Sequence, residues 1–229
     1  HEIADEDVHS FVDAMESDID TDRYETYEDL EEYMRGSAAA VGVMMTDIMD
    51  LDDDEYERAL PHAIKLGEAF QLTNFIRDVR EDVVDRDRVY LPIETLEGHD
   101  VDRDQVIRLE TSEEFRAAVE EELHRTEELY REGVAGIRFL PEDCQFAVLL
   151  AAVLYAEHHR EIRAVDLDVI THEPSLSTAR KLLLVAKTRW HWLWNKDPEA
   201  VFHRVSAVPA GEANHHEHGS SWMRWLPTR

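Results

Sequence analysis

The chain has 229 residues, which is enough for one sizeable domain with its own hydrophobic core. It carries 52 Asp and Glu residues against 24 Lys and Arg residues, a formal net charge of −28. This balance excludes nucleic acid as a partner, because binding to phosphates requires a basic surface. Concentrated salt screens the self-repulsion of such a surface, so we expect a halophilic source and give isolated acids little functional weight.

The one cysteine, Cys144, permits no internal disulfide, which is typical of a reducing cytoplasm. The longest apolar stretch, residues 146–156, is too short to cross a bilayer. We therefore expect a cytoplasmic protein with at most weak, peripheral membrane contact, and the sequence indicates no oligomeric state. Such contact would involve tryptophans late in the chain, although packing in the core or tail is the simpler interpretation of them: Trp190, Trp192, Trp194, Trp222 and Trp225.

Helical rather than alternating periodicity runs through almost every segment, which predicts an all-α domain over residues 1–205. Thr26 and Asp29 resemble a capping box that opens a helix ending near Met49. Residues 206–229 lose the periodicity and are predicted to form a mobile tail.

An acidic loop at residues 50–55 precedes a second helix, which has Pro61 near its start and ends near Asp85. A connection containing Pro92 and Gly98 follows. Further helices are predicted over residues 102–108, 112–133, 141–163 and 175–196.

One face of the second helix is polar where a core stripe could have been. At about 100° per residue, five side chains fall within roughly 80° of one another: Gln71, Asn74, Asp78, Asp82 and Asp85. Like charges one turn apart destabilise an isolated helix, so we expect a cation between Asp78 and Asp82. Carboxylate and amide oxygens are ligands that suit Mg²⁺, which substrate phosphates often complete.

A bare D-x-x-x-D pair carries little information here, because acid density alone repeats it at Asp18 and Asp22 and at Asp50 and Asp54. The whole string is specific: Q-x-x-N-x-x-R-D-x-x-x-D, then R-x-Y-L-P, over residues 71–92. This string resembles the second aspartate-rich motif of the squalene/phytoene synthase family, most closely its phytoene synthase branch. Three other stretches agree with that family: Y-x-T-x-x-D-L-x-x-Y at residues 24–33, SAAAVG at 37–42, and the helices around AVLYAEHHREI and STARKLLLVAKTRW.

The resemblance implies an all-helical isoprenoid synthase that joins two geranylgeranyl diphosphates head to head in a Mg²⁺-dependent reaction, with Mn²⁺ as an alternative metal. One diphosphate departs, the second prenyl chain attacks the allylic cation, and loss of a proton gives the cyclopropyl compound prephytoene diphosphate. A second ionisation and rearrangement then gives phytoene, the first step of carotenoid biosynthesis.

The resemblance also implies residue roles. Asn74, Asp78 and Asp82 are expected to bind the metal, the two aspartates being catalytic, and Tyr33 is expected to assist proton transfer. Substrate binding is expected of Gln71, Asn74, Arg77, Arg88, Tyr24 and Tyr90. For Tyr24 and Tyr90, a role as structural anchors is equally open. Arg77 and Arg88 suit a diphosphate because guanidinium pairs with its oxygens bidentately.

Small or soft residues follow Tyr33 on one predicted helix face, at Ser37, Ala40 and Met44, which would leave volume for a prenyl chain. Close helix packing is the alternative interpretation of the same pattern. Ala39 replaces a glycine that is common in the family and is expected to add a methyl group to the cavity wall.

The first aspartate-rich motif of the family would lie upstream of His1, so half of the expected metal cluster is not in this sequence. We therefore expect the chain to be incomplete, with N-terminal helices missing. Two other functions stay open: a squalene or dehydrosqualene synthase that uses farnesyl diphosphate, and a non-catalytic relative that serves as an assembly or binding protein.

Overall fold

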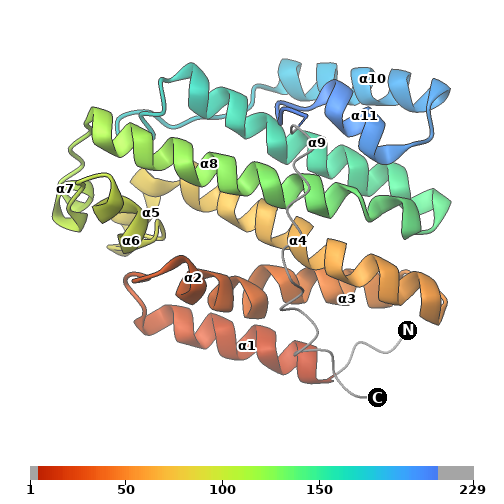
Figure 1. Ribbon diagram of the computed structural model, residues 1–229, viewed down its shortest axis with the longest axis horizontal. Helices are drawn as coiled ribbons and strands as arrows, with labels where there is room; N and C mark the ends of the chain where they lie inside the picture. Colours follow the sequence, from red (N-terminus) through yellow and green to blue (C-terminus); the bar gives the residue numbers. More distant parts are fainter. Residues whose placement is uncertain (1–4, 211–229) are drawn as a thin grey trace.

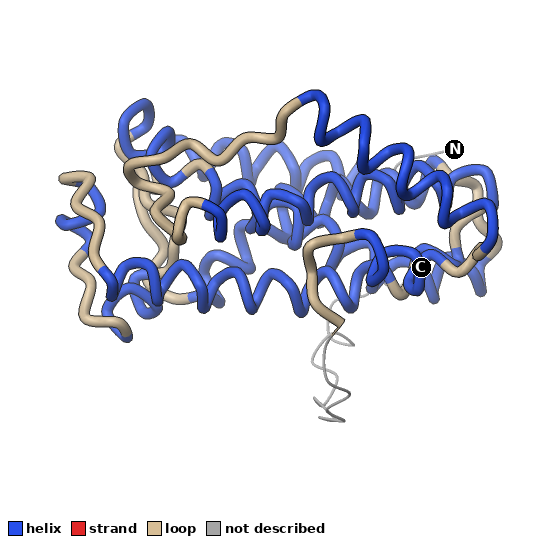
Figure 2. The backbone as a smooth tube through the Cα atoms, turned by 90° about the horizontal axis from the view of Figure 1, so that it is seen from above, coloured by secondary structure: helices blue, strands red, loops and turns tan. Residues whose placement is uncertain are grey.

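The computed structural model describes residues 5–210, and within this range the chain is an all-α bundle with no β-strand (Figures 1 and 2). This confirms the predicted fold class. None of the described helices is long and apolar enough to cross a membrane. In chain order the elements are α1 (Asp5–Asp20), α2 (Tyr27–Met34), the π-helical turn η1 (Arg35–Ala39), α3 (Ala40–Ile48), α4 (Asp53–Arg77), α5 (Val79–Arg86), α6 (Ile93–Gly98), α7 (Arg103–Ile107), α8 (Glu113–Val134), the 3₁₀ turn η2 (Ile137–Phe139), α9 (Glu142–Ala164), α10 (Thr178–Trp194) and α11 (Pro198–Val205).

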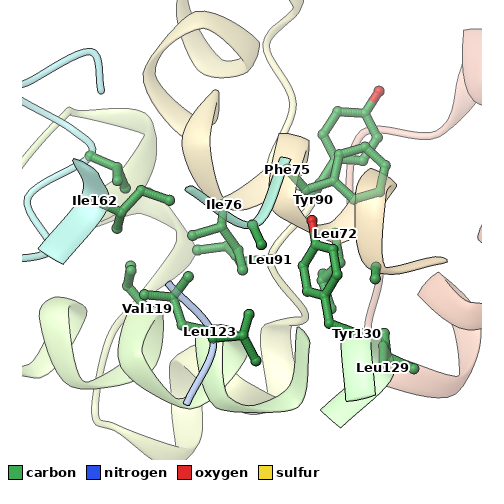
Figure 3. Packing of buried hydrophobic residues seen from close by; sticks show 14 of the residues in the cluster. Leu72, Phe75, Ile76, Tyr90, Leu91, Val119, Leu123, Leu129, Tyr130 and Ile162 are labelled. Atoms are coloured by element: carbon green, nitrogen blue, oxygen red, sulfur yellow. The ribbon is translucent and has the colours of Figure 1, made fainter. Parts of the chain in front are cut away.

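The long helix α4 is the centre of the bundle. It contacts α3 and η1 on one side and α8 and α9 on the other, and Figure 1 shows it running between the α1–α3 layer and α8. Leu72 and Ile76 are fully buried in a core that also contains Leu123 of α8 and Ile162 of α9 (Figure 3). Because α4 is enclosed from several sides, the side chains that it presents to a cavity are held on a rigid element.

Two glycines allow α4 to pack very close to its neighbours. A Cβ atom on Gly67 would lie 2.5 Å from the carbonyl oxygen of Ala38 in η1, and one on Gly133 of α8 would lie 2.8 Å from Leu66 of α4. Any larger side chain at either position would force the backbones apart. These contacts set the distance of η1 and α8 from the central helix.

The predicted capping box is confirmed. The Thr26 hydroxyl accepts a hydrogen bond from the Asp29 backbone at 3.1 Å, and the Asp29 carboxylate accepts one from the Thr26 backbone at 2.9 Å. The helix that it opens extends to Ile48, but a π-helical turn at residues 35–39 interrupts it. Such turns insert one residue and rotate everything that follows.

The predicted start of the second long helix was wrong. Helix α4 begins at Asp53, with Asp52 as its N-cap, so Pro61 lies inside it. The predicted end was also incomplete, because the helix breaks at Asp78 and resumes as α5. The start lies earlier than predicted because the three consecutive acids at residues 53–55 stabilise a helix N-terminus.

The predictions for the helices that became α7, α8, α9 and α10 are confirmed within a few residues. Three helices were missed: α1, α6 and α11. Helix α6 is short and lies in a connection that contains Pro92 and Gly98, which act as its N-cap and its last residue. Residues 211–229 lie outside the described part of the chain, so the predicted tail stays a prediction.

Candidate active site

The polar face of α4 continues through the break at Asp78. The Asp78 backbone donates to the Asn74 carbonyl at 2.8 Å, and the Asp82 backbone donates to the Asp78 carbonyl at 2.8 Å. Helical hydrogen bonding therefore persists on both sides of the junction, where Asp78 has φ −99 and ψ 14. This continuity keeps Asn74, Asp78 and Asp82 on one side of the helix.

These side chains line a cavity of about 650 Å³, which we call the polar cavity. Seven of the nine predicted site residues line it: Tyr33, Gln71, Asn74, Arg77, Asp78, Asp82 and Tyr90. The other two, Tyr24 and Arg88, do not line it. Asp85, the fifth residue of the predicted stripe, is exposed and is absent from the lining, because the short helix α5 turns it outward.

A second cavity of about 610 Å³ lies between α3, α4, α8 and α9, and we call it the apolar cavity. Its lining is dominated by small and apolar side chains such as Met45, Ala63 and Ala147. The two cavities share part of their walls: Ala38, Val41, Gln71, Asn74 and Tyr155 line both. They are therefore neighbouring compartments, one containing the charged groups of the motif and the other lined mainly by apolar side chains, and both are in the size range of small-molecule sites.

The π-helical turn changes which residues of α3 face the cavities. The sequence predicted a face with Ala40 and Met44 behind Tyr33, but the lining contains Val41 and Met45 instead. The extra residue in the turn rotates α3 by about one position. Ala39 was also misplaced, because it is buried and lines neither cavity.

Asp78 and Asp82 each have an arginine partner. Arg77 donates to Asp78 through Nε at 2.7 Å and through a second nitrogen, and this hydrogen bonding raises the pKa of Arg77. Arg86 donates to Asp82. Arg86 was missed, although its i,i+4 spacing from Asp82 is a recognisable pairing signal.

Asp82 is the more unusual of the two carboxylates. Only 3% of the residue is exposed, and burial raises the pKa of its carboxyl group to about 6. The nearby negative charges of Asp78 and Glu81 add to the rise, whereas Arg86 opposes it. A group that resists ionisation next to other acids favours a bound cation.

Four aromatic rings form one wall beside the carboxylates. Phe75 and Tyr90 stack with centroids 4.1 Å apart (Figure 3), and Tyr33 lies 6.2 Å from Phe75 and 6.3 Å from Tyr90. Tyr24 is buried behind them, 5.4 Å from Tyr33. Tyr24 therefore packs against the wall without lining the polar cavity, whereas Tyr33 and Tyr90 line it.

The connection after α5 is tied to the segment before α2. The Ile93 backbone donates to the Tyr24 carbonyl at 2.9 Å, and the Val89 backbone donates to Asp22 at 3.1 Å. Asp87 permits the sharp turn by adopting a left-handed conformation with φ 56, which Asp tolerates better than most other non-glycine residues. Arg88 then donates to the Tyr90 hydroxyl at 3.1 Å, so it orients a cavity residue from outside the cavity.

The donor set fits a divalent metal, but only in part. Asp78, Asp82 and the amides of Asn74 and Gln71 are hard oxygen ligands that line one cavity. Among the side chains that the structure describes, however, no group of three or more His, Cys, Asp or Glu gathers closely enough to hold a metal ion. The described residues thus supply a partial ligand set.

Comparison with known proteins agrees with this geometry. Residues 1–181 match the squalene/phytoene synthase family. The chain is 31% identical over 175 residues to 15-cis-phytoene synthase of Synechocystis, covering 72% of this chain and 52% of that protein. It is 32% identical over 166 residues to phytoene synthase of Rhodobacter capsulatus, covering 72% and 48%.

A solved structure is also similar: a crystal structure of a dehydrosqualene synthase in complex with ligand has a TM-score of 0.74 and 28% identity, covering 82% of this chain and 65% of that one. Squalene synthase HpnC of Alicyclobacillus acidocaldarius shares the fold, with a TM-score of 0.65 at 24% identity. The chain spans about half the length of the curated relatives that it matches. On the family match and the relatives together, the chain belongs to the squalene/phytoene synthase family.

Proposed function

We propose that the protein is a phytoene synthase, which condenses two geranylgeranyl diphosphates head to head to phytoene through prephytoene diphosphate. The observation that carries this proposal is the shared wall between the polar and apolar cavities. A prenyl diphosphate has the same division, with a charged head and a hydrocarbon tail. Gln71 and Asn74 stand at the boundary, where the head of such a substrate would join its tail.

Asn74, Asp78 and Asp82 would hold Mg²⁺, or Mn²⁺, through carboxylate and amide oxygens, and the bound metal supplies charge stabilisation to the departing diphosphate. The raised pKa of Asp82 supports this assignment, since its burial beside Asp78 leaves negative charge that a cation would neutralise. Arg77 holds Asp78 in place and can transfer hydrogen bonds to diphosphate oxygens when the head group enters.

The aromatic wall suits the cationic part of the reaction. The C–O bond of one substrate breaks with its electron pair on the diphosphate, and the allylic cation would lie beside the faces of Tyr33, Phe75 and Tyr90. A double bond of the second chain supplies the electrons of the new C–C bond. The proton lost on ring closure passes to an oxygen in the polar cavity, where we propose that Tyr33 assists the transfer.

Arg88 and Tyr24 support this wall without lining the cavity. Arg88 fixes the Tyr90 hydroxyl, and Tyr24 packs against Tyr33 and Tyr90. Their proposed roles are therefore positional. This replaces the direct substrate contact expected of Arg88 and favours, for Tyr24, the structural role that the sequence left equally open. Both roles can be tested by measuring whether substitution of Arg88 or Tyr24 changes the orientation of the Tyr90 ring.

Use of farnesyl diphosphate, as in a squalene or dehydrosqualene synthase, is the alternative reaction. This alternative is supported by the structural similarity to a dehydrosqualene synthase. The phytoene synthases among the curated relatives favour the longer substrate. The third possibility, a non-catalytic family member that serves as an assembly or binding protein, predicts no product from either substrate.

The decisive experiment incubates the protein from its complete reading frame with radiolabelled geranylgeranyl or farnesyl diphosphate, Mg²⁺ and concentrated KCl. We expect a C40 hydrocarbon from the C20 substrate, and at least about a 100-fold loss of rate in Asp78→Asn. Asp85→Asn is the matched control, because it makes the same change on the same predicted stripe at an exposed residue outside the cavity. The enzyme assignment would be overturned if neither substrate gave a product, or if Asp78→Asn and Asp85→Asn lowered the rate equally.

A further inference from the structure

Helix α10 is attached to the bundle through a narrow stripe. Leu184, Thr188 and Trp192, spaced four residues apart, are its buried residues, and they pack towards α9 and α11. Figure 1 shows α10 at the outer edge of the bundle, on the side opposite α1. Trp192 is only 4% exposed, so the core interpretation is correct for this tryptophan. Most of the other residues of the helix are exposed.

The outward face of α10 is apolar. Five large side chains on it are mostly exposed: Leu182 at 65%, Leu183 at 54%, Trp190 at 60%, Leu193 at 55% and Trp194 at 77%. At about 100° per residue they fall within an arc of about 120°, together with Ala186. Trp190 and Trp194 contact each other edge to face, with centroids 6.1 Å apart. An amphipathic surface helix normally buries its apolar face against the protein. Helix α10 instead exposes this apolar arc to the outside.

Basic residues border this apolar arc. By the same helical geometry Arg189 lies at one edge and Lys187 at the other, and both are exposed. No acid occurs between Glu173 and Asp197, in a chain that has 52 acids, and three of its four lysines lie in this interval. Arg180 is already occupied, because it donates to the buried Glu157 at 2.7 Å. The outer surface of α10 is thus locally basic on an acidic protein.

We infer that α10 is a docking surface for an anionic lipid bilayer. Tryptophan and leucine side chains on a convex helix insert between lipid head groups, while Lys and Arg at the edges of the apolar face pair with lipid phosphates. The distant acids do not prevent this, because salt screens their repulsion beyond about 8 Å at physiological ionic strength. A second copy of this chain is a poorer occupant, since its acidic surface would pair with the bases but not cover the apolar arc.

The position of α10 relates the inferred surface to the apolar cavity. Trp192 lies 6.1 Å from Phe146 of α9, and the Arg189 guanidinium lies 5.4 Å from the same ring. On another side of α9, Cys144 and Ala147 line the apolar cavity. One helix therefore separates the cavity from the docked bilayer. The docking itself does not rest on the proposed reaction, and its test needs no substrate.

The first test is flotation with vesicles of phosphatidylcholine alone or mixed with phosphatidylglycerol. We expect binding to the anionic vesicles that weakens as KCl rises, and at least a tenfold weakening in Leu193→Glu. Val84→Glu is the matched control, since Val84 of α5 is 59% exposed and receives the same added charge. Replacing Lys187 and Arg189 by Gln should weaken binding about fivefold per charge.

The second test locates the tryptophans. In a Trp222→Phe, Trp225→Phe background, brominated lipids should quench the remaining fluorescence, because Trp190 and Trp194 enter the bilayer. Circular dichroism checks that each variant is folded. The inference is overturned if folded protein binds no vesicles, if Leu193→Glu and Val84→Glu bind equally, or if light scattering shows that Leu193→Glu only abolishes self-association.

Discussion

Asp82 and Glu127 are buried to nearly the same extent, but their surroundings shift their pKa values in opposite directions. They are 3% and 2% exposed. Burial raises the pKa of Asp82 to about 6, whereas the His159 ring, 3.5 Å from Glu127, and the hydrogen bond from Arg163 outweigh burial and lower the pKa of Glu127. Arg163 donates to Glu127 at 2.6 Å and also reaches Glu120 at 2.9 Å. The charge of Glu127 is therefore compensated inside the protein.

Asp82 lacks this compensation. Its partner Arg86 is half exposed, and its other charged neighbours are the acids Asp78 and Glu81. Burial alone does not mark a functional acid, because burial also raises the pKa of Glu68 and Glu122, and neither lines either cavity. The combination of burial, surplus negative charge and an adjacent cavity distinguishes a site from a structural ion pair.

The largest effect should separate the two acids by activity. Asp82→Asn is expected to lower the rate about 100- to 1000-fold, because it removes a carboxylate that would hold the metal ion, and that ion would stabilise the departing diphosphate. Glu127→Gln should retain nearly full activity per folded molecule, since it lies outside both cavities. Product formation from labelled geranylgeranyl diphosphate measures both. Comparable losses in the two variants would contradict the distinction.

The second effect is on stability, where we expect Glu127→Gln to be more damaging than Asp82→Asn. Glu127→Gln should lower the free energy of unfolding by about 2 kcal/mol, because it leaves the partly buried Arg163 with a weaker partner next to His159. Urea unfolding at constant KCl gives this value. As an internal comparison, Glu128→Gln on the same helix should change stability by no more than about 0.5 kcal/mol.

The third prediction uses pH. The folded pKa of Asp82 is above its unfolded value, so its contribution to stability is complete below about pH 4 and is lost as pH rises through about 6. Without metal, Asp82→Asn should therefore be more stable than the parent above pH 6, by about 1 kcal/mol, and similar to it near pH 4. Thermal unfolding at several pH values measures the difference. An advantage for Asp82→Asn at low pH instead would refute the raised pKa.

The smallest effect concerns the arginines. Arg86→Gln should cost about 0.5 kcal/mol or less, since half of the Arg86 side chain is exposed and solvent screens its ion pair. Arg163→Gln should cost more, because Arg163 serves two carboxylates, one of them buried. Parallel denaturation of both variants checks the order. If Arg86→Gln lowers the free energy of unfolding more than Arg163→Gln does, the Asp82–Arg86 ion pair is structural, like that of Glu127 with Arg163.

Much of the candidate site was predictable from local sequence. The spacing of Gln71, Asn74, Asp78 and Asp82 follows from helical geometry alone, and these four residues line one cavity. The capping box at Thr26 was readable for the same reason, since each partner is three residues from the other. The prediction was wrong for Asp85, which does not line the cavity, because the helix breaks at Asp78 and this break limits how far helical spacing can be extended.

The parts that could not be predicted depend on neighbours distant in sequence. Tyr155 lines both cavities, yet nothing local distinguishes it from an ordinary core residue of α9. The change from Ala40 and Met44 to Val41 and Met45 needed the π turn, which forms where Gly67 lets η1 approach α4. Helical periodicity assumes an uninterrupted helix, so it does not detect such a turn.

By itself the sequence determined the helical class, the candidate metal-binding side chains and their order along α4 and α5, because hydrogen bonding and side-chain spacing within a helix are local. Only the tertiary structure decided which acid is compensated and which faces a cavity. It also decided that α10 presents its leucines and tryptophans outward, because Leu184, Thr188 and Trp192 form the stripe that packs on the bundle. Burial and charge compensation are sums over all neighbours in space, and those neighbours come from helices that the chain brings together only on folding.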